Sequence, residues 1–568
     1  PNAPIDSATG LPVPTIAVAT DGGISVILDT GIVSDFGTTQ KTNHVTFDGD
    51  KLISTWNTDG GSDGVRVFDS NYLQGDGFNF NRQYRRGQAS TPGTLADEDG
   101  DAIVGYNKHI VVGMPSGLNV FEEDESLSGG NVTNGLGAYI TSDYNTGWMN
   151  GDIKLATLSD TDDTDAVGAE LVTNGTFDSD ISGWSLREGN GSFSASSGVA
   201  TLTYVSNPTS WVTSLSGITA GKTYTLSFDL VSASTSSVQF YYNHGSVGGD
   251  LGVSLSGSTA GNYSATFTAA TTTVTIFPRI YASGNMVIDN VSVRLAEEDR
   301  SVNGNGLQVF GTVTKTAVAT GADLVGYSGF SNSTNYLFQP YNSDLDFGTG
   351  DFSVTLWFNT PDKSVTGTLL HRGSNDIGDT SWATNAVTQI EFNTSNLYAL
   401  VGTNNFSVNS GPNVPLTSIS NNTWHHYVMV RRSGRIYAYL DGNYIDDVAN
   451  TLTNTNSTGK VYIGERPYAS RVFNGSLALY RISATAPSAE QIKKIYEDEK
   501  VLFQDNAKAT LYGTSDAVTA LAYDDDTELL HVGTSAGRSV FQGLRRIDNT
   551  TDAVGVAISA SNGMVAED

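Results

Sequence analysis

The stretch NTWHHYVMVRRSGRIYAYLDGNYID, residues 422–446, alternates apolar and polar side chains around two turns. The dipeptides Ser433-Gly434 and Asp441-Gly442 are turn formers that connect antiparallel strands. Side chains two positions apart lie on the same face of a strand. The stretch therefore predicts consecutive β-strands with one buried face. The residues expected on that face are Val428, Val430, Ile436, Ala438 and Leu440.

Two further segments flank this stretch. DFSVTLWFNT (351–360) precedes it, with Leu356 and Phe358 expected in the core, and VYIGERPYASRVFNGSLALYRIS (461–483) follows it. Together the three segments resemble the laminin G-type, concanavalin A-like lectin sandwich. The resemblance implies a lectin domain over residues 299–502.

A single helix is expected directly after the second sandwich, in PSAEQIKKIYEDEK (487–500). Ser488 and Gln491 have the spacing of a capping box at its start. The apolar side chains that would dock the helix onto the sandwich are Ile492, Ile495 and Tyr496. A helix in this place is common in proteins with this lectin domain.

Composition sets the class of the protein. The 568 residues are enough for about four domains of average size. The chain contains no cysteine, which excludes disulfides and thiol chemistry, and its net charge of −30 argues against nucleic acid as a partner. No apolar run approaches the roughly 20 residues of a membrane span, so no membrane insertion is expected.

Segments near both ends of the chain share one pattern of strand, acidic turn, strand, glycine turn and strand. They are HVTFDGDKLISTW (44–56), AIVGYNKHIVVGMPSGLNVF (102–121) and AVTALAYDDDTELLHVGTSAGRSVF (517–541). Repeated antiparallel units of this kind indicate a radial β-array. They resemble propeller blades, and the resemblance implies an all-β fold in which residues 1–165 and 503–568 form one β-propeller, interrupted by two inserted β-sandwich (jelly-roll) domains.

The ends of this propeller allow two interpretations. Residues 16–27 and 553–568 each hold part of a unit, and together they would complete one blade and close a ring. Alternatively, both are edges of a longer array. Residues 138–160 are expected to begin a blade to which residues 507–514 supply a further strand, and the acidic stretch 160–169 is expected to be the linker into the insertion.

The first insertion, residues 166–298, is marked by its two ends. ELVTNGTFDSDISGWS (170–185) and MVIDNVSVRL (286–295) resemble the end motifs of jelly-roll carbohydrate-binding modules. In its middle, alternation places Tyr224, Leu226, Phe228 and Leu230 inward, as it does Val238, Phe240, Tyr242, Val274, Ile276 and Ile280.

The opposite face of these strands is expected to carry a carbohydrate site. Aromatic rings cover the apolar face of a sugar, while amides and guanidinium groups bond its hydroxyls. The candidate residues are Trp211, Gln239, Tyr241, Asn243, Arg279 and Tyr281, with Phe277 also facing outward. The alternative is a solvated sheet face with incidental aromatic residues.

The resemblance to this module also implies a structural Ca²⁺ that ties its two ends together. The ligand role would fall to Asp289, with Glu170, Asn174 and Asp178 as partners. Hard oxygen ligands of these types suit Ca²⁺.

No catalytic constellation is recognised, and the protein is expected not to be an enzyme. A retaining glycosidase needs two carboxyl groups about 5 Å apart, whereas Glu391 has no carboxylate two or four residues away. Asp344, Asp346 and Asp351 have loop-like surroundings. His425 and His426 are neighbours on a strand and point to opposite faces, so they cannot serve one site. Asp441 is expected to act as a turn residue.

A propeller that carries two lectin-like sandwiches resembles the virion appendage proteins of marine bacteriophages, such as tail fibres and spikes. The resemblance implies a virion-surface adhesin that binds host cell-surface glycans, contacts other virion proteins and is present as a homo-oligomer or in many copies. The alternatives are a polysaccharide depolymerase tailspike, a secreted bacterial surface adhesin, and inserts that only decorate the scaffold.

Overall fold

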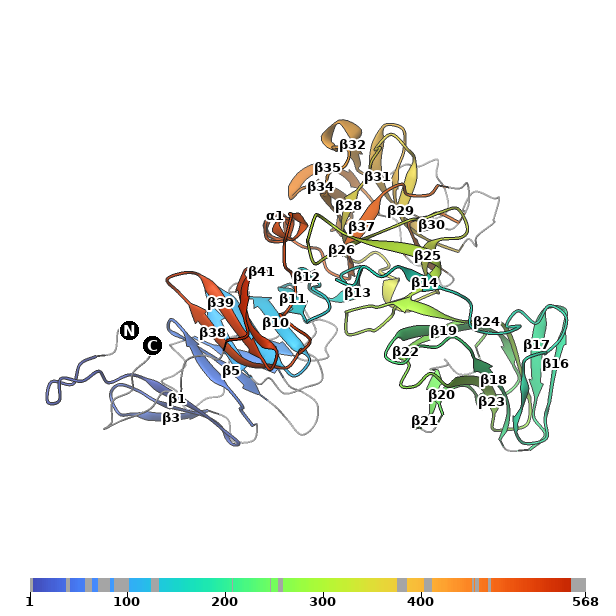
Figure 1. Cartoon of the computed structure of the whole chain (residues 1–568), viewed down its shortest axis with the longest axis horizontal. Coiled ribbons are helices and arrows are strands. Elements are labelled where there is room, and N and C mark those ends of the chain that lie inside the picture. The colour runs from blue at the N-terminus through green and yellow to red at the C-terminus, as the bar shows by residue number, and fades with distance from the viewer. Residues whose placement is uncertain are drawn as a thin grey trace.

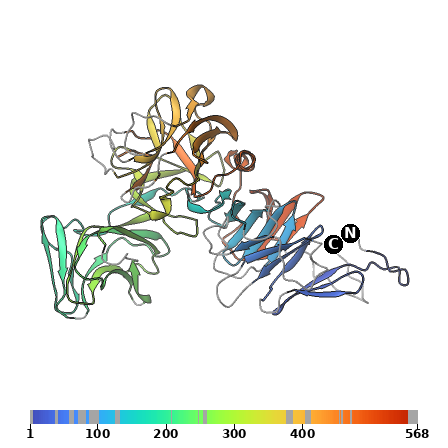
Figure 2. The same cartoon turned by 180° about the vertical axis from the view of Figure 1, so that it is seen from behind.

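The computed structural model describes residues 4–36, 41–56, 64–69, 82–85, 102–123, 132–206, 208–245, 247–253, 259–374, 386–402, 411–451, 454, 459–467 and 471–552. The described chain is all-β apart from 3-10 turns and one α-helix, α1 (Ala489–Glu499). Its strands gather in three lobes (Figure 1), and the same three lobes are seen from behind (Figure 2). In this part of the chain, no helix is long and apolar enough to span a membrane.

The first lobe joins the beginning and the end of the chain in four antiparallel sheets. Their strands are β1 (Ile16–Thr20), β2 (Gly23–Ile27) and β3 (Val33–Phe36); β4 (Val45–Asp48), β5 (Lys51–Trp56), β6 (Gly64–Phe68) and β7 (Arg82–Arg85); β8 (Ala102–Tyr106), β9 (His109–Met114), β10 (Gly117–Glu122), β11 (Leu136–Ile140) and β12 (Met149–Asn150); and β38 (Val518–Asp524), β39 (Leu529–Thr534), β40 (Gly537–Gln542) and β41 (Arg545–Thr550). The expected strand–turn–strand units are therefore confirmed as antiparallel meanders.

Apolar side chains pack these sheets against one another in sequence. Ile24 and Val26 meet Leu52 between the first two sheets, and further clusters join the second sheet to the third and the third to the fourth. Gly113 allows the last contact, because a Cβ there would lie 2.4 Å from Val518 Cγ1. Residues 553–568, which were expected to complete a blade, lie outside the described residues, so ring closure stays a prediction.

Two expectations about the borders of the insertion are wrong. The chain leaves the first lobe after β12, at residue 150, since β13 (Ile153–Thr157) pairs with β37 (Ser476–Ser483) of the second sandwich. Residues 507–514 form no strand, and instead Asn145 Nδ2 donates to the carbonyls of Ala509 (2.8 Å) and Leu544 (3.1 Å). The two ends of the insertion do meet here, and they are joined by the Asn145 side chain and one main-chain hydrogen bond, from Leu511 N to the Thr141 carbonyl (2.8 Å), and not by a ladder.

The first sandwich has two antiparallel sheets around one core. One sheet has the order β15 (Ser185–Glu188), β18 (Thr209–Leu215), β23 (Val274–Ile280), β20 (Val238–His244) and β21 (Val247–Val253). The other contains β16 (Ser192–Ser196), β17 (Val199–Thr203), β24 (Asn285–Glu297), β19 (Thr223–Ala233) and β22 (Gly261–Thr268). The residues expected to face inward on β19, β20 and β23 line this core, which confirms their alternation.

The second sandwich is the lectin-like lobe. One sheet contains β13, β37, β28 (Phe352–Asn359), β33 (His425–Arg432), β34 (Arg435–Leu440) and β35 (Asn443–Ala449). The other contains β25 (Leu307–Ala317), β27 (Tyr336–Gln339), β36 (Lys460–Ile463), β29 (Gly367–Gly373), β30 (Ala386–Phe392), β31 (Asn396–Val401) and β32 (Asn413–Pro415). The short strand β26 (Val325–Ser328) pairs with β25 and β37.

The hairpin of β33 and β34 buries both of its faces, which corrects the expected core. Ile436, Ala438 and Leu440 do face the sandwich core, as do Leu356 and Phe358, but their partners there are Tyr427 and Met429. Val428 and Val430 lie on the other face, where they pack with Ile492 of α1. A one-residue difference in register exchanges the two faces of a strand. Because the helix covers the outer face, both sets of positions are apolar.

Helix α1 forms as expected. Ser488 Oγ accepts from Gln491 N (3.2 Å), and Gln491 Oε1 accepts from Ser488 N (2.9 Å), which completes the capping box. Ile495 is buried, and the Tyr496 ring stacks 5.8 Å from that of Trp357. The helix thus closes the outer face of the lectin sheet.

The two sandwiches are joined without a flexible linker. Main-chain pairing of β24 with β25, through Ala296↔Gln308 and Glu297↔Leu307, makes their sheets continuous. The expected acidic linker is also part of this junction, since β14 (Ala166–Gly168) pairs with β25. Asp160 is held between Arg300 (2.9 Å) and Lys315 (3.0 Å). The acidic residue therefore neutralises cations at the junction instead of extending into solvent.

Glu297 is buried in the same junction and accepts a hydrogen bond from Tyr327 (2.6 Å). Burial, followed by the negative charge of Asp160, raises the pKa of Glu297 to about 8, although Lys315 and Arg300 oppose the shift. The folded protein therefore binds this proton more tightly than the unfolded chain does.

We predict that this carboxyl makes the folded state less stable as pH rises. The contribution of Glu297 to the free energy of unfolding is full below the ordinary glutamate pKa of 4.5, and it is lost as pH rises through about 8. Glu297→Gln, which imitates the protonated form, should reduce the fall in melting temperature across that range. Parallel melting curves of the wild type and the variant at each pH would contradict the assignment.

A buried carboxylate ties the first lobe to the lectin sandwich. Glu499, at the end of α1, accepts hydrogen bonds from Trp148 N and Trp357 Nε1, both at 2.7 Å. Arg481 pairs with it through both terminal nitrogens, and its Nη1 also donates to the Trp148 carbonyl (2.8 Å). Trp148 directly precedes β12, whereas Arg481 belongs to β37. The Glu499 carboxylate therefore accepts hydrogen bonds from groups of both lobes.

We predict that Glu499→Ala costs about 3–5 kcal/mol of unfolding free energy, because it leaves the Arg481 charge buried and unpaired. Denaturant unfolding followed by tryptophan fluorescence measures the loss, since Trp148 and Trp357 both report on this site. Glu497→Ala is the matched control on the same helix. Glu497 lies at the surface and should change the free energy by less than about 0.5 kcal/mol. Equal effects of both substitutions would contradict the prediction.

Candidate functional site: the outer face of the first sandwich

The outer face of the sheet β15-β18-β23-β20-β21 brings together five of the six predicted sugar-binding residues. Gln239 lies opposite Arg279, and Tyr241 lies opposite Phe277, across the β20–β23 pair. Cross-strand partners share one face of a sheet. Asn243 follows on the same face of β20, and Tyr281 lies one residue beyond the end of β23. The alternation in the sequence therefore predicted this grouping correctly.

Two tyrosines form the aromatic part of this face. The hydroxyl groups of Tyr241 and Tyr281 are hydrogen-bonded at 2.6 Å, and the Tyr281 side chain is exposed. The Tyr241 ring stacks on Phe277, with centroids 5.4 Å apart. Burial, followed by the hydrogen bond between the two hydroxyl groups, raises the pKa of Tyr241 to about 12. The Tyr241 ring thus rests on Phe277, the Tyr281 hydroxyl is tied to it by the hydrogen bond, and the Tyr241 hydroxyl stays protonated at neutral pH.

A network of paired charges surrounds the tyrosines. Asp250 accepts from Arg187 (2.9 Å), Arg279 (3.1 Å) and Asn243 (2.7 Å), while Glu188 pairs with Arg279 at 2.5 Å. Partial burial alone would raise the pKa of Asp250, but the hydrogen bonds from Arg187 and Asn243 and the two positive charges lower it. The face therefore presents planar groups in fixed positions with balanced charge.

Arg187, Glu188 and Asp250 were not predicted from the sequence. They belong to the edge strands β15 and β21, which reach the site only through the order of strands in the sheet. The Arg187 guanidinium also lies 3.8 Å from the centre of the Phe277 ring. Phe277 itself is fully buried beneath these side chains, so it supports the face without forming its surface.

Trp211 does not belong to this group. Its ring packs 5.7 Å from that of Phe193 against the core of the sandwich. On β18, Trp211 lies on the same face of the strand as Thr209, Thr213 and Leu215, which are all buried. This face points toward the core of the sandwich and away from the sugar-binding face. Its placement on the sugar-binding face is therefore corrected.

The four predicted calcium ligands do not converge. The Glu170 carboxylate accepts from Val172 N (2.9 Å), Val293 N (3.0 Å) and Ser292 Oγ (2.6 Å), and so ties the two ends of the module together directly. Asn174 donates to the Asp180 carbonyl at 2.9 Å. Within the described ranges, no three acidic or histidine side chains are grouped so as to hold a metal ion.

The other two predicted ligands lie in an acidic neighbourhood. Asp178 accepts from Thr176 (2.9 Å), and Asn290 Nδ2 bridges Asp289 (3.2 Å) and Asp229 (2.8 Å). Burial raises the pKa of Asp289, and the charges of Asp229 and Asp178 add to the shift against a hydrogen bond from Asn290. This arrangement does not fit the predicted ligand set, and calcium binding stays a prediction.

In the lectin sandwich, Glu391 is fully buried among cations and hydroxyls. It pairs with Arg466 (3.0 Å) and Arg471 (2.8 Å) and accepts from Thr368 (2.8 Å) and Gln389 (2.6 Å). Both carboxylate oxygens therefore already have partners. This geometry is that of a structural anchor.

The other residues weighed for chemistry have structural partners too. His425 Nε2 accepts from Ser420 N (2.9 Å) and its Nδ1 lies 2.7 Å from Asp441, whereas the His426 ring packs beside Trp357 on the opposite face. Asp441 occupies a turn with φ of 51°. Asp346 pairs with Arg372, Asp351 accepts from Ser433 N, and Asp344 lies in a 3-10 turn.

Residues 331–493 match the concanavalin A-like lectin/glucanases superfamily in its laminin G form. This part of the chain is therefore similar to concanavalin A-like lectin domains. No curated protein sequence matches the chain.

Solved structures similar to the chain include domain 4 of an extracellular arabinanase from Geobacillus stearothermophilus in complex with arabinotriose, at 16% identity over 35% of this chain and 92% of that chain, with a TM-score of 0.24. The binding domain of botulinum neurotoxin DC is 14% identical over 37% of this chain and 48% of that one, with a TM-score of 0.24. A sialidase carbohydrate-binding module from Ruminococcus gnavus, bound to α2,3-sialyllactose, is 9% identical over 26% of this chain and 84% of that chain, with a TM-score of 0.22.

We predict that Glu391→Gln destabilises the lectin domain by about 3–5 kcal/mol, because it leaves the buried Arg466 without its carboxylate. Thermal and denaturant unfolding measure the change. Asp447→Asn is the control, since it removes an Arg–Asp pair with Arg435 at the surface of the same domain and should hardly move the midpoint. A Glu391→Gln protein as stable as this control would show that Glu391 is not an anchor.

Proposed function

We propose that this protein is a glycan-binding adhesin on the surface of a bacteriophage particle, and that it binds host cell-surface glycans without cleaving them. The observation that carries the glycan-binding part is the pair of the exposed Tyr281 and the half-buried Tyr241 beside Arg279 and Asn243. Tyrosine rings cover the apolar face of a sugar, and amide and guanidinium groups bond its hydroxyls.

The fixed geometry of this face supports the proposal further. Asp250 holds Arg279, Arg187 and Asn243 in place, so these groups need little ordering when a ligand binds. Binding sites gain affinity when the contacting groups are already ordered. A merely solvated sheet face would not need such a network.

The virion placement rests on the resemblance of the whole arrangement, in which blade-like sheets carry two sandwiches, to phage appendage proteins. Single lectin sites are usually weak, so many copies on one particle supply affinity through effective concentration. The partners of this proposal are therefore a host polysaccharide, other virion proteins and further copies of the chain. The propeller ring is part of the same proposal.

The test is a glycan array probed with the full chain, with and without Ca²⁺, followed by a reducing-sugar assay on every ligand found. We expect binding without release of reducing ends. Tyr241→Ala and Tyr281→Ala should each weaken binding by tenfold or more, because each removes one ring of the pair. Tyr444→Ala removes an exposed tyrosine from the lectin sheet and serves as the control.

Each other result has a defined meaning. Release of reducing ends would identify a depolymerase and overturn the adhesin proposal. Binding that neither tyrosine substitution changes would place the site elsewhere on the molecule. A silent array, with the protein folded, would favour inserts that only decorate the scaffold.

A further inference from the structure

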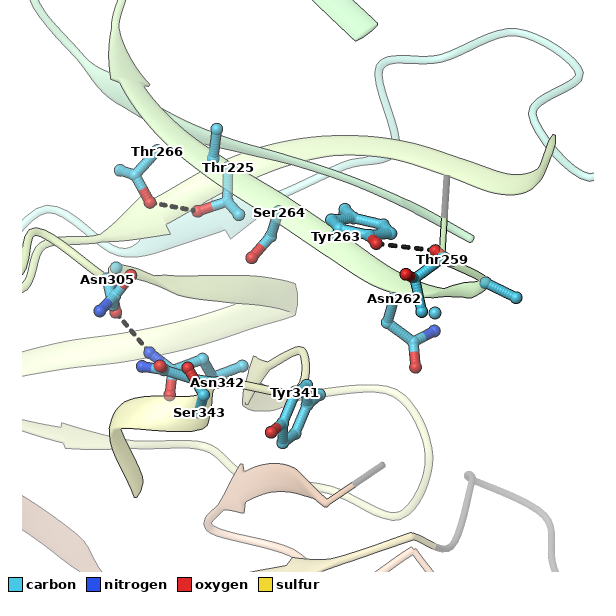
Figure 3. Close-up of a pocket in the computed structure, with 15 residues that line it drawn as sticks. Thr225, Thr259, Asn262, Tyr263, Ser264, Thr266, Asn305, Tyr341, Asn342 and Ser343 are labelled. Atoms are coloured by element: carbon cyan, nitrogen blue, oxygen red, sulfur yellow. Dashed lines mark hydrogen bonds between the residues drawn. The ribbon is translucent and has the colours of Figure 1, made fainter. Parts of the chain in front are cut away.

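A second candidate site lies where the two sandwiches meet. A hollow of about 400 Å³ opens between β22 of the first sandwich and the segment that follows β27 of the second. In Figure 3, Asn262, Tyr263 and Ser264 form one wall, and Asn342 and Tyr341 face them from the other. The hollow belongs to the opposite sheet of the first sandwich from the Tyr241 face, so the two sites are separate.

The lining of this hollow is polar but uncharged. Amides come from Asn262, Asn305, Gln339 and Asn342, hydroxyl groups from serine and threonine, and rings from Tyr263 and Tyr341. None of the described residues that line it carries a charge, although the chain has a net charge of −30. Amides and hydroxyls both donate and accept hydrogen bonds, as sugar hydroxyls do.

The same lining excludes other ligand classes. A divalent cation needs carboxylate or similar oxygen ligands in a tight group, and an acidic sugar needs arginine or lysine beside it. Neither kind of side chain is among the described lining residues. A neutral, hydroxyl-rich ligand is the class that remains.

Several lining groups are held in place and others are left unpaired. Tyr263 donates to the Thr259 carbonyl (2.7 Å), as a dashed line in Figure 3 shows. Gln339 Nε2 donates to the Asn305 carbonyl (2.6 Å). Gln339 Oε1 and Asn342 Nδ2 are buried and make no hydrogen bond within the described chain.

A neighbouring hollow extends the site. It has a volume of about 350 Å³, shares Asn262 and Tyr263 with the first, and adds the rings of Phe310 and Phe338. Its lining also includes the charged side chains of Asp229 and Lys460, so the uncharged lining belongs to the first hollow alone. Each volume lies within the range of sites for small molecules. Two adjoining hollows separated by one tyrosine suit a ligand with repeated units.

We propose that this junction hollow is a second glycan site, which binds a neutral oligosaccharide across the two sandwiches. The inference goes beyond the proposed function, because it needs neither the Tyr241 face nor a virion. Its binding residues come from both sandwiches, so the site exists only where the two are joined.

The test is calorimetric titration of the full chain with cellohexaose, laminarihexaose, xylohexaose and mannohexaose, and with polygalacturonate as the acidic probe. Ser264 is exposed in the wall, so Ser264→Trp should fill the hollow without changing the core. Ser264→Ala is the matched control at the same position. Tyr341→Ala, on the opposite wall, is a second variant in case the tryptophan disturbs folding.

We expect at least one neutral hexasaccharide to bind the wild type, Ser264→Ala and Tyr241→Ala with similar affinity, and to bind Ser264→Trp and Tyr341→Ala at least tenfold more weakly. No binding by any neutral probe, or unchanged binding by folded Ser264→Trp, would overturn the inference. If only Tyr241→Ala abolished binding of the neutral hexasaccharide, the ligand would lie on the outer face. That result would support the proposed function and refute the junction site. Binding of polygalacturonate that Ser264→Trp abolishes would refute the neutral ligand class.

Discussion

The arrangement of the lobes depends on one buried carboxylate. Glu499 is removed from water, and a buried charge is tolerated only when its partners are all in place. Those partners are Trp148 from the first lobe and Arg481 and Trp357 from the lectin sandwich. The lobes must therefore adopt one relative position before the helix end can be buried. The position of the lectin sandwich in turn fixes the position of the first sandwich, which is attached to it.

Main-chain hydrogen bonds between β24 and β25 fix the position of the first sandwich relative to the lectin sandwich. Because β24 and β25 pair directly, its sheet is an extension of the lectin sheet and not a tethered module. The outer face around Tyr241 and the junction hollow around Tyr263 therefore keep a constant separation and orientation. A rigid pair of sites binds best to a polymer whose spacing matches theirs, which makes geometry as selective as side-chain chemistry.

Local patterns predicted local structure well. The capping box of α1 and the inward alternation of β19, β20 and β23 depend on residues close in sequence, and each is confirmed. The errors arise where distant segments decide. Val428 and Val430 look like core residues until α1, more than 50 positions later, covers their face. Asp160 looks like linker until Arg300 and Lys315 surround it. Likewise, Arg187 and Asp250 reach the candidate site only through the order of the strands.

The closeness of the two ends of the insertion has a mechanical consequence. The chain leaves the first lobe after β12 and returns near Ala509, and the side chain of Asn145, shortly before the exit, bonds the returning segment directly. A pulling force on either sandwich is thus carried by two adjacent chain crossings at once, and not by a single tether. The buried contacts of Glu499 with Trp148 and Arg481 lie close to these crossings. A force on the sandwiches therefore reaches the sheets of the first lobe through these contacts as well as through the two chain segments.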